Sequence, residues 1–313
     1  MANVVIIGHI PPNSAERMKA VFPPDWTVNI AAPEDASPFL AEADAVIPEH
    51  ARIDREFLDR APKLKLVQTG AGYDNVDIPA CTERGIPVCN AAGINATAVA
   101  EHVMAMILGW YKNIPYLDRF MKERRDEAEP DYAGGEIYGK TVGIIGFGAV
   151  GKKVAGYCIA FGMNVLACHT HRVELTGVEQ VDLDALLRRS DIVSVHVPLT
   201  AETRGMIGRE ALAKMKPSAL LVNTARGAIV DEAALTEALQ KRTIAGACLD
   251  VYEKEPLAPE SPLRALPNVI LTPHTAGLPD GRYFHLPRYV FFCQNIERVM
   301  HGQPPENALN HPA

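Results

Sequence analysis

The chain has 313 residues, of which 48% are hydrophobic, and its formal net charge is -7 at pH 7. This length is too great for one small hydrophobic core and suits two domains, and the composition is ordinary for a globular α/β enzyme. The negative net charge argues against nucleic acid as a partner, and the sequence contains no lysine or arginine cluster that would oppose this interpretation.

The six cysteines are scattered and form no C-x-x-C pair. Several lie in apolar runs, where cysteine behaves as a small hydrophobic residue, so we expect a reduced, cytoplasmic protein. The apolar run at residues 3–8 is too short for a signal peptide and has no basic leader, which predicts a buried strand. No stretch approaches the roughly 20 apolar residues that span a bilayer, so we expect a soluble protein without membrane contact.

Short apolar runs alternate with helical patterns in the first third of the chain. We expect strands at residues 3–8, 44–47, 65–68 and 86–89, and an amphipathic helix at residues 14–21. This alternation predicts a parallel sheet with crossover helices. Residues 98–117 have apolar side chains at helical spacing and are expected to lead towards a second domain, with a surface loop at residues 126–135.

Residues 142–151 read V-G-I-I-G-F-G-A-V-G, an apolar run that turns into the spacing G-x-G-x-x-G at Gly146, Gly148 and Gly151. The first glycine permits a tight turn, the second allows a pyrophosphate to approach the backbone, and the third lets a helix pack on the strand. Free N–H groups and the positive end of the helix dipole then bind the anion. With a helical segment at 152–161 and a strand at 164–168, the pattern predicts a dinucleotide site.

Further strands are expected at residues 192–197, 219–223, 245–249 and 269–272, and a last helix at 289–300 is expected to return to the first domain. The sequence therefore predicts an α/β fold with two parallel-sheet domains of the Rossmann or flavodoxin kind. In such a doubly wound sheet the ligand crevice lies at the carboxyl ends of the strands.

The end of the second strand bears on the choice of cofactor. In NAD sites an acidic residue about 20 positions beyond the first glycine binds the ribose 2′-hydroxyl. Here residues 168–172 read C-H-T-H-R, with no acid before Glu174. A carboxylate would repel a 2′-phosphate, whereas His169, Thr170 and Arg172 can hydrogen-bond to it. We predict a preference for NADP(H), with NAD(H) left open because Arg172 is alternatively an exposed loop residue. His169-x-His171 lacks further nearby ligands, so no metal site is expected.

Three polar residues follow predicted strands further along the chain: Arg226, Glu255 and His274. Reduction of a 2-oxo acid needs a cation for the carboxylate, a proton donor for the ketone oxygen and a hydride. Arginine forms forked contacts with carboxylates, and histidine, with an ordinary pKa of about 6.5, donates a proton when a carboxylate raises that pKa. A lone histidine after a strand is more often a structural residue, but three such groups at successive strand ends favour catalysis.

The same residues lie in motifs that resemble the D-isomer-specific 2-hydroxyacid dehydrogenase family over nearly the whole chain. The motifs are G-A-G-Y-D-N-V-D (70–77), N-A-T-A-V-A-E-H (95–102), the glycine turn, H-V-P-L-T (196–200), N-T-A-R-G (223–227), L-D-V-Y-E-K-E-P (249–256) and T-P-H-T-A-G (272–277). The resemblance implies that Arg226 binds the substrate carboxylate and polarises the substrate, that His274 is the acid/base, and that Glu255 orients it. It also implies that the N–H groups of Ala71 and Gly72 bind the carboxylate.

The resemblance further implies two domains and a set of cofactor contacts. Residues 1–98 and 284–313 would form a discontinuous substrate domain, hinged on a cofactor domain of residues 99–283, with the active-site cleft between them and a homodimer through the cofactor domains. Hinge closure would exclude water. Asp250 and the backbone around Cys248 would meet the nicotinamide carboxamide. The implied cofactor-binding residues are Thr97, Gly146, Gly148, Ala149, Val150, Gly151, His169, Thr170, Arg172, Val197, Pro198, Thr203, Thr224, Ala225, Asp250, His274, Ala276 and Gly277.

Comparison of single residues with the branches of this family narrows the prediction of substrate and cofactor. His169 at the acid position is similar to the NADP-preferring glyoxylate and hydroxypyruvate reductases. Glu255 argues against formate dehydrogenases, which are expected to carry glutamine there, and Ala71 against phosphite dehydrogenases, which are expected to carry lysine. Many phosphoglycerate dehydrogenases are expected to have a C-terminal regulatory domain, and nothing follows Ala313 in the sequence.

We therefore expect an oxidoreductase that transfers a hydride between NADP(H) and a small 2-oxo or D-2-hydroxy acid, such as glyoxylate or hydroxypyruvate. An NAD-dependent enzyme for a bulkier 2-oxo acid is one alternative. A dinucleotide-sensing protein like the transcriptional corepressors of this fold is another, although those are expected to have long extra tails. His102 and His196 are expected to be structural; the alternatives are a catalytic role for His102 and a place in the cofactor crevice for His196. Glu49, His50, Tyr283 and His285 are candidates for lining the substrate pocket, with packing roles as the alternative.

Overall fold

The structure is a computed structural model of the chain, and it describes residues 1–49, 51–123, 134–279 and 284–312. The chain forms two compact units: a first unit of Met1–Asn95 with Leu278–Ala313, and a second unit of Ala96–Gly277. The boundaries expected from the sequence were 98/99 and 283/284. The substrate and cofactor roles of the two units stay predictions.

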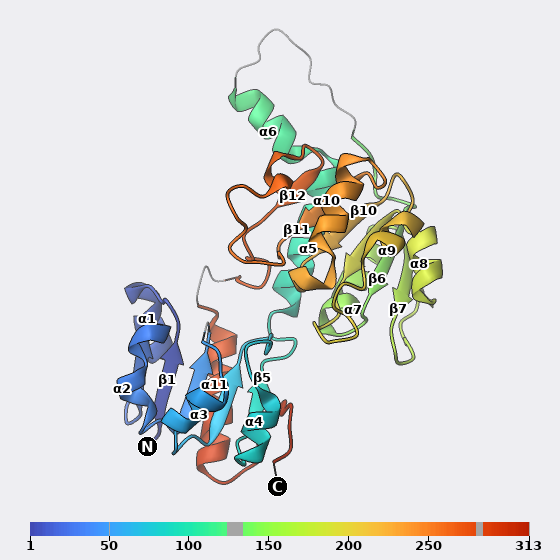
Figure 1. The fold of residues 1–313 in the computed structure, drawn as a ribbon. Coiled ribbons are helices and arrows are strands. Elements are labelled where there is room, and N and C mark those ends of the chain that lie inside the picture. Colours follow the sequence, from blue (N-terminus) through green and yellow to red (C-terminus); the bar gives the residue numbers. More distant parts are fainter. Residues whose placement is uncertain (50, 124–133, 280–283, 313) are drawn as a thin grey trace. The chain divides into compact units, whose positions relative to one another are not determined.

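The first unit is built on a five-stranded sheet with the order β2-β1-β3-β4-β5 (Figure 1). Its strands are β1 (Asn3–Ile7), β2 (Thr27–Ala31), β3 (Ala45–Pro48), β4 (Leu66–Thr69) and β5 (Val88–Asn90), and neighbouring strands are parallel. The helices of this unit are α1 (Pro12–Lys19), α2 (Ser37–Leu40), α3 (Arg55–Arg60), α4 (Ile78–Glu83) and α11 (Leu286–Met300), with a 3-10 turn η1 (Pro33–Asp35). The last helix, α11, packs against β4 and buries Tyr289 and Phe292.

The second unit is built on a seven-stranded parallel sheet with the order β12-β11-β10-β9-β6-β7-β8. Its strands are β6 (Thr141–Ile145), β7 (Asn164–Cys168), β8 (Val178–Gln180), β9 (Ile192–Val195), β10 (Leu220–Asn223), β11 (Gly246–Leu249) and β12 (Val269–Leu271). Its helices are α5 (Ala96–Tyr111), α6 (Ile114–Lys122), α7 (Ala149–Ala160), α8 (Leu183–Arg189), α9 (Arg209–Lys214) and α10 (Glu232–Gln240), with 3-10 turns η2 (Gly227–Ile229) and η3 (Pro262–Ala265). The two parallel sheets confirm the predicted α/β fold class.

The central strands are apolar along their whole length because both of their faces are covered. Strands β9, β10 and β11 are buried at every position, as expected for a parallel sheet packed between helices. One buried cluster on each side of the sheet fills the space between strands and helices in the second unit. This arrangement leaves the carboxyl ends of the strands as the place where polar loop residues gather.

Two features differ from the expectation, and a third is largely untested. Strands β2 and β8 were missed, because both lie at sheet edges and are only partly buried, so their sequences carry polar residues. The helix expected at residues 98–117 is two helices, α5 and α6. They are separated at Asn113, which has a left-handed backbone (φ 52) and is followed by Pro115 near the start of α6. The loop expected at residues 126–135 lies mostly outside the described residues.

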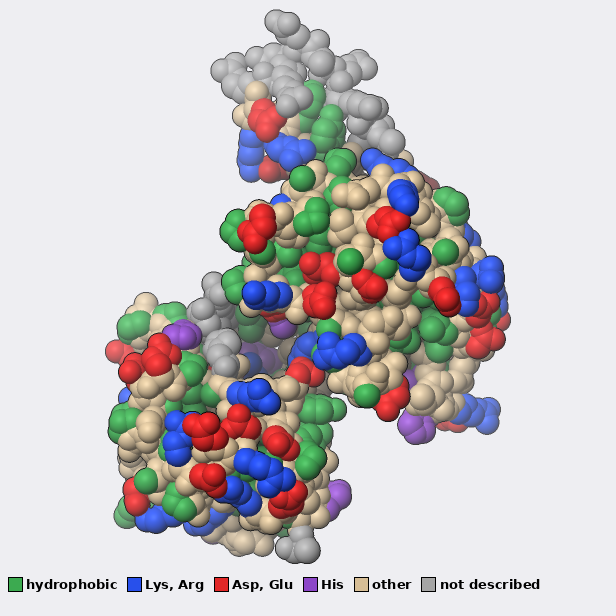
Figure 2. All heavy atoms as spheres, in the orientation of Figure 1, with side chains coloured by type: hydrophobic (Ala, Val, Ile, Leu, Met, Phe, Trp, Pro, Cys, Tyr) green, Lys and Arg blue, Asp and Glu red, His purple; other side chains and the backbone are tan. Residues whose placement is uncertain are grey.

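Acidic and basic side chains are interspersed over both units on the face that Figure 2 shows. Among the described residues, none of the helices combines the length and the apolar composition that crossing a membrane requires.

Candidate active site

The glycine turn joins β6 to α7 and has the geometry that a dinucleotide needs. Gly146 has a φ of 93, and a Cβ added there would lie 2.5 Å from the carbonyl oxygen of His196. A Cβ on Gly151 would lie 2.2 Å from the carbonyl oxygen of Gly146, whereas a Cβ on Gly148 would meet no heavy atom within 4 Å. The first and third glycines are therefore required by packing, and the second faces open space. The N–H groups of the first turn of α7 have no partners within the helix, so they fit a pyrophosphate.

His169, which follows β7, is hydrogen-bonded to the glycine turn. Its Nδ1 accepts a hydrogen bond from the N–H of Phe147 at 3.3 Å. The loop is held from the other side by Gln180 of β8, whose Nε2 donates to the carbonyl oxygens of His169 and His171 at 3.1 and 2.9 Å. Arg172 is exposed, and its Nε lies 3.7 Å from Oε1 of Glu174. The edge strand that the sequence did not reveal thus shapes the loop predicted to meet the adenosine ribose.

The remaining predicted cofactor positions differ in their surroundings. Val197 lies against the glycine turn, 2.8 Å from where a Cβ of Gly146 would be. The hydroxyl of Thr203 donates to the carbonyl oxygen of Pro198 at 2.6 Å and accepts from the N–H of Thr200 at 2.8 Å, so it closes its own loop. The hydroxyl of Thr224 is buried without a hydrogen-bond partner among the described residues, which is the kind of group that a bound ligand satisfies. The others are partly or fully exposed and lie at helix starts or in loops: Thr97, Ala149, Val150, Thr170, Pro198, Ala225 and Gly277.

Glu255 and His274 form a direct contact. Oε2 of Glu255 lies 2.6 Å from Nδ1 of His274, and Oε1 accepts the N–H of Tyr252 at 3.1 Å. Burial acts to raise the pKa of Glu255, but the hydrogen bond with His274, the N–H of Tyr252 and the charge of Arg226 outweigh it and lower that pKa. The carboxylate is therefore ionised near neutral pH. It holds the ring through Nδ1 and leaves Nε2 for other partners.

The backbone around His274 is held by Asp250. His274 has a left-handed backbone (φ 54), and its N–H donates to the carbonyl oxygen of Asp250 at 2.8 Å. The fully buried carboxylate of Asp250 accepts from the N–H groups of Thr275 and Ala276, both at 2.9 Å, and from the hydroxyl of Thr272 at 2.6 Å. A left-handed residue other than glycine costs about 1 kcal/mol, so these contacts keep His274 in place. The predicted contact of Asp250 with the nicotinamide stays a prediction.

His102 joins this network from α5. Its Nε2 lies 3.1 Å from Oγ1 of Thr272 and 3.7 Å from Oδ1 of Asp250. His196 makes a hydrogen bond with the hydroxyl of Ser194 at 2.8 Å, and burial lowers the pKa of its imidazole to about 4. Both side chains therefore make structural contacts within the second unit. The described residues contain no group of three or more His, Cys, Asp and Glu side chains suited to a metal ion.

Arg226 lies three residues after the end of β10 and immediately before η2, and its Nη1 donates to the carbonyl oxygen of Ala225 at 2.8 Å. The next residue, Gly227, packs so tightly that a Cβ there would lie 1.8 Å from the carbonyl carbon of Tyr252. The hydroxyl of Tyr252 in turn donates to the carbonyl oxygen of Thr272 at 2.8 Å. These contacts bring the loops of Arg226, Glu255 and His274 together at the carboxyl ends of β10, β11 and β12. The glycine of N-T-A-R-G was not recognised as part of this geometry from the sequence.

In the first unit, Ala71 and Gly72 lie in the loop that follows β4. Asn90 donates through Nδ2 to the carbonyl oxygen of Ala71 at 3.2 Å, and the N–H of Ala91 donates to the carbonyl oxygen of Gly70 at 2.9 Å. Within the described parts of the chain, the N–H groups of Ala71 and Gly72 make no backbone or side-chain hydrogen bond. They are therefore free to bind an anion.

Glu49 follows β3 and is bonded to α11, which the sequence did not indicate. Its Oε1 accepts from Nη2 of Arg288 and from the hydroxyl of Tyr289, each at 2.7 Å. His285 is buried at the start of α11, which suits a packing role. His50 and Tyr283 lie outside the described residues.

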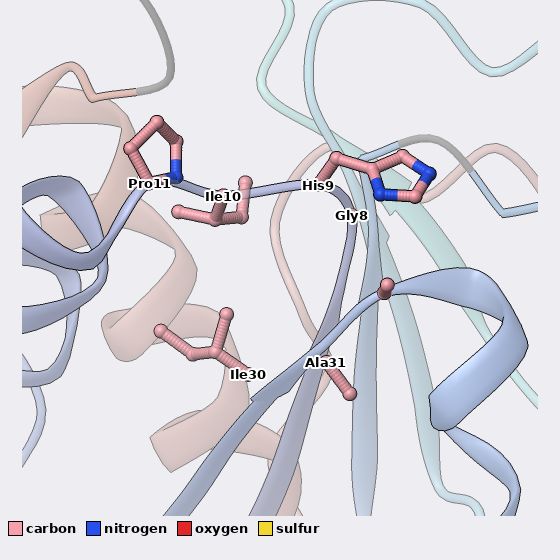
Figure 3. Close-up of a pocket in the computed structure, with 7 residues that line it drawn as sticks. Gly8, His9, Ile10, Pro11, Ile30 and Ala31 are labelled. Atoms are coloured by element: carbon pink, nitrogen blue, oxygen red, sulfur yellow. The ribbon is translucent and has the colours of Figure 1, made fainter.

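A surface hollow of about 410 Å³ lies at the carboxyl ends of β1 and β2 (Figure 3). Its lining is mostly apolar and consists of Gly8, His9, Ile10, Pro11, Ile30, Ala31 and Ala32. None of the residues predicted for substrate or cofactor lines it.

Comparison with known proteins agrees with the resemblance seen in the sequence. The family described as "D-isomer specific 2-hydroxyacid dehydrogenase, NAD binding domain" matches residues 104–276. The chain is 44% identical to the D-3-phosphoglycerate dehydrogenase of Archaeoglobus fulgidus over 273 residues, covering 86% of this chain and 51% of that protein. It is 38% identical to glyoxylate/hydroxypyruvate reductase B of Pectobacterium carotovorum over 291 residues, covering 90% and 89% of the two chains.

Among solved structures, the chain resembles the NADPH-dependent glyoxylate/hydroxypyruvate reductase of Sinorhizobium meliloti determined with citrate. The TM-score is 0.85 at 27% identity, and the match covers 99% of this chain and 98% of that one. The chain spans about half the length of the archaeal phosphoglycerate dehydrogenase, but nearly the full length of the Pectobacterium reductase. On these matches, the chain belongs to the D-isomer specific 2-hydroxyacid dehydrogenase family.

Proposed function

We propose that the protein is an oxidoreductase that transfers a hydride between NADP(H) and a small 2-oxo or D-2-hydroxy acid. The observation that carries this proposal is the 2.6 Å contact between Nδ1 of His274 and Oε2 of Glu255. Although burial acts to raise the pKa of Glu255, the hydrogen bond with His274 and, to a smaller extent, the charge of Arg226 lower that pKa. The same unit contains a glycine turn whose middle glycine faces open space. An anion clamp, an acid/base pair and a dinucleotide turn in one unit are what a 2-oxo acid reductase needs.

Each of the three residues has a role that follows from its chemistry. The guanidinium of Arg226 binds the carboxylate of the substrate and polarises the ketone oxygen. Glu255 holds the imidazole of His274 through Nδ1, so that Nε2 donates a proton to the ketone oxygen as this becomes a hydroxyl. The ionised carboxylate of Glu255 stabilises the protonated imidazole before the transfer, and in the oxidation direction His274 takes the proton back. A bound nicotinamide supplies or accepts the hydride.

For the cofactor, the N–H groups at the start of α7 would hold the pyrophosphate, and the orphaned hydroxyl of Thr224 would gain a partner. The preference for NADP(H) is supported by His169, which stands where an acid would select NAD(H) and which lies next to the glycine turn. Glu174 opposes this preference, because its carboxylate lies 3.7 Å from Arg172. We therefore propose NADP(H) as the better cofactor, with NAD(H) also accepted.

For the substrate, we propose a small 2-oxo acid such as glyoxylate or hydroxypyruvate, in keeping with the name of the Pectobacterium relative. The N–H groups of Ala71 and Gly72 would bind its carboxylate, since they make no hydrogen bond among the described residues. The enzyme would be cytoplasmic, since all six cysteines are free and a reducing compartment keeps them so.

We also propose a homodimer formed through the second unit. Ile114 and Met121 at the two ends of α6 are 55% and 73% exposed, and covering such apolar side chains favours association.

The experiment that tests the function measures oxidation of NADPH and NADH with a panel of 2-oxo acids. We expect turnover of at least one small 2-oxo acid, with a higher kcat/KM for NADPH than for NADH. If the folded protein binds NADPH or NADH but turns over no 2-oxo acid, the proposal fails in favour of the dinucleotide-sensing, corepressor-like alternative.

A further inference from the structure

In the first unit, a partly buried ion pair lies at the carboxyl end of β3. Nη2 of Arg288 donates to Oε1 of Glu49 at 2.7 Å, and the hydroxyl of Tyr289 donates to the same oxygen at 2.7 Å. The side chains of Arg288 and Glu49 are only 14% and 13% exposed. The guanidinium carbon also lies 5.2 Å and 5.6 Å from the ring centres of Tyr289 and Phe292. Both charges are thus held in a mostly apolar setting.

The pair does not use all of its hydrogen-bonding atoms. Both contacts with Glu49 fall on Oε1, and Oε2 has no hydrogen bond among the described residues. On Arg288, Nε is buried without a partner in the described parts of the chain, and Nη1 has none there either. A buried ion pair adds little stability over apolar side chains of the same size, and buried polar atoms are normally paired. A role limited to fastening α11 to β3 therefore leaves these unused atoms unexplained.

The unused donor lies beside the loop predicted to bind the substrate carboxylate. A Cβ added to Gly70 would lie 3.5 Å from Nη1 of Arg288. The next two residues are Ala71 and Gly72, whose N–H groups make no hydrogen bond within the described residues. The first unit therefore presents two backbone donors, a guanidinium donor and a carboxylate acceptor in one neighbourhood.

We infer that Arg288 and Glu49 form a specificity site for a 2-oxo acid whose third carbon carries a hydroxyl, such as hydroxypyruvate. The guanidinium donates to the hydroxyl oxygen, and the carboxylate of Glu49 accepts the hydroxyl proton. A hydroxyl is both donor and acceptor, so it matches the one unused acceptor and the unused donors of the pair. This inference rests on the proposed function, since it concerns selectivity among substrates of that reaction.

The charges of Arg288 and Glu49 disfavour 2-oxo acids with other substituents on the third carbon. Because the guanidinium and the carboxylate neutralise each other, a second carboxylate on the substrate meets Glu49, and a cationic side group meets Arg288. A methyl group leaves both polar atoms unpaired, and sites built to bind a hydroxyl reject the analogue that lacks it by large factors. We therefore expect hydroxypyruvate to be preferred over pyruvate, over oxaloacetate and over 2-oxo acids with a cationic side chain.

The test compares kcat/KM for hydroxypyruvate, pyruvate and oxaloacetate in the full-length protein. In the unaltered enzyme we expect hydroxypyruvate to exceed each of the others by at least about 10-fold. In Glu49→Gln the guanidinium is no longer neutralised, so the ratio of oxaloacetate to pyruvate should rise by about 10-fold. In Arg288→Gln the carboxylate is left alone, so the same ratio should fall. Tyr289→Phe keeps both charges and is the matched control, in which the hydroxypyruvate-to-pyruvate ratio should stay within about 2-fold.

Folding is followed in each variant by the melting temperature and by binding of NADPH. If Glu49→Gln or Arg288→Gln does not fold, Glu49→Asp and Arg288→Lys keep the charges and shorten the reach of one group. These two variants should lose the preference for hydroxypyruvate over pyruvate, and their kcat/KM for oxaloacetate should not rise. Equal kcat/KM for the three acids, or selectivity that folded variants leave unchanged, would overturn the inference while the proposed function stands. Absence of turnover with every 2-oxo acid would instead overturn the proposed function.

Discussion

Gly227 lies against the backbone of Tyr252 so closely that a Cβ on Gly227 would come within 1.8 Å of the carbonyl carbon and 2.0 Å of the carbonyl oxygen of Tyr252. One neighbour of this contact is Arg226, and Glu255 follows three residues after Tyr252, with its Oε1 on the N–H of Tyr252. The close approach of two backbones thus sets how the arginine loop and the glutamate loop lie together.

Gly227→Ala should therefore damage catalysis more than folding. The methyl group must push the two loops apart, and we expect kcat/KM to fall by at least about 100-fold, because displacements of 1 Å at a site cost that much. The free energy of unfolding should decrease by about 1–3 kcal/mol. Steady-state kinetics and urea unfolding measure the two effects. Gly156→Ala in α7 is the control, since its Cβ meets nothing within 4 Å, and it should stabilise the protein by about 0.5–1 kcal/mol.

Substitutions of His274 and Arg226 should have different effects on kcat and KM, because His274 donates the proton and Arg226 binds the substrate carboxylate. His274→Ala should lower kcat by about 100-fold to 10,000-fold, the range that general acid catalysis contributes, with a small change in KM. Arg226→Ala should raise KM for the 2-oxo acid and lower kcat as well, because the guanidinium acts on both the bound substrate and the polarised ketone. Both variants should still bind NADPH, as followed by its fluorescence. Unchanged turnover in His274→Ala would exclude the assigned proton donor.

Asp250→Asn should act through the backbone of His274. In the unaltered protein, the N–H groups of Thr275 and Ala276 donate to separate oxygens of the Asp250 carboxylate. The neutral amide of asparagine keeps the size of the side chain, but only its oxygen can still accept a hydrogen bond. We expect kcat to fall and the melting temperature to drop, in line with a loss of about 1–3 kcal/mol for a buried charged hydrogen bond. Measuring NADPH affinity in parallel separates this effect from a direct cofactor contact. A weaker NADPH affinity at unchanged stability would favour the predicted contact with the nicotinamide.

Stability should depend on pH through His196. Its folded pKa of about 4 lies below the ordinary value of 6.5 because burial disfavours the charged ring. The unfolded chain therefore binds a proton that the folded chain does not, and the contribution of neutral His196 is complete above about pH 6.5 and lost as the pH falls towards 4. The loss should be on the order of 1–3 kcal/mol. Urea unfolding between pH 4 and 7 measures it, and His196→Gln, which cannot titrate, should show a flatter dependence.

An acid at the end of β7 should reverse the cofactor preference. His169→Asp places a carboxylate where it can accept from a ribose hydroxyl and repel a 2′-phosphate, so kcat/KM for NADPH should fall by at least about 10-fold relative to NADH. Glu174→Gln should shift the ratio the other way, since it removes the carboxylate beside Arg172. Arg188→Gln on α8 offers a surface arginine paired with Asp184 as a charge-matched control. Equal ratios in all three variants would show that this loop does not select the cofactor.

Much of the fold can be predicted from local patterns in the sequence. The apolar runs of β6, β9, β10 and β11 and the glycine spacing after β6 reveal buried strands and a strand-to-helix turn without any knowledge of neighbours. The sequence also predicts Arg226, Glu255 and His274 as site residues, because each follows such a strand and the carboxyl ends of parallel strands share one edge. The edge strands β2 and β8 were not predicted, because partly solvated strands carry polar residues, as loops do.

Only the tertiary structure decided which side chains meet. Arg288 and Glu49 are 239 residues apart, and His102 and Thr272 are 170 apart. Nothing in the periodicity of either segment specifies the other, because pairing depends on the order of strands in a sheet and on which helix covers which strand. The tight contact of Gly227 with Tyr252 is of the same kind. Local sequence determines whether a segment is buried and how it turns, whereas contacts between distant residues depend on the packing of the whole unit.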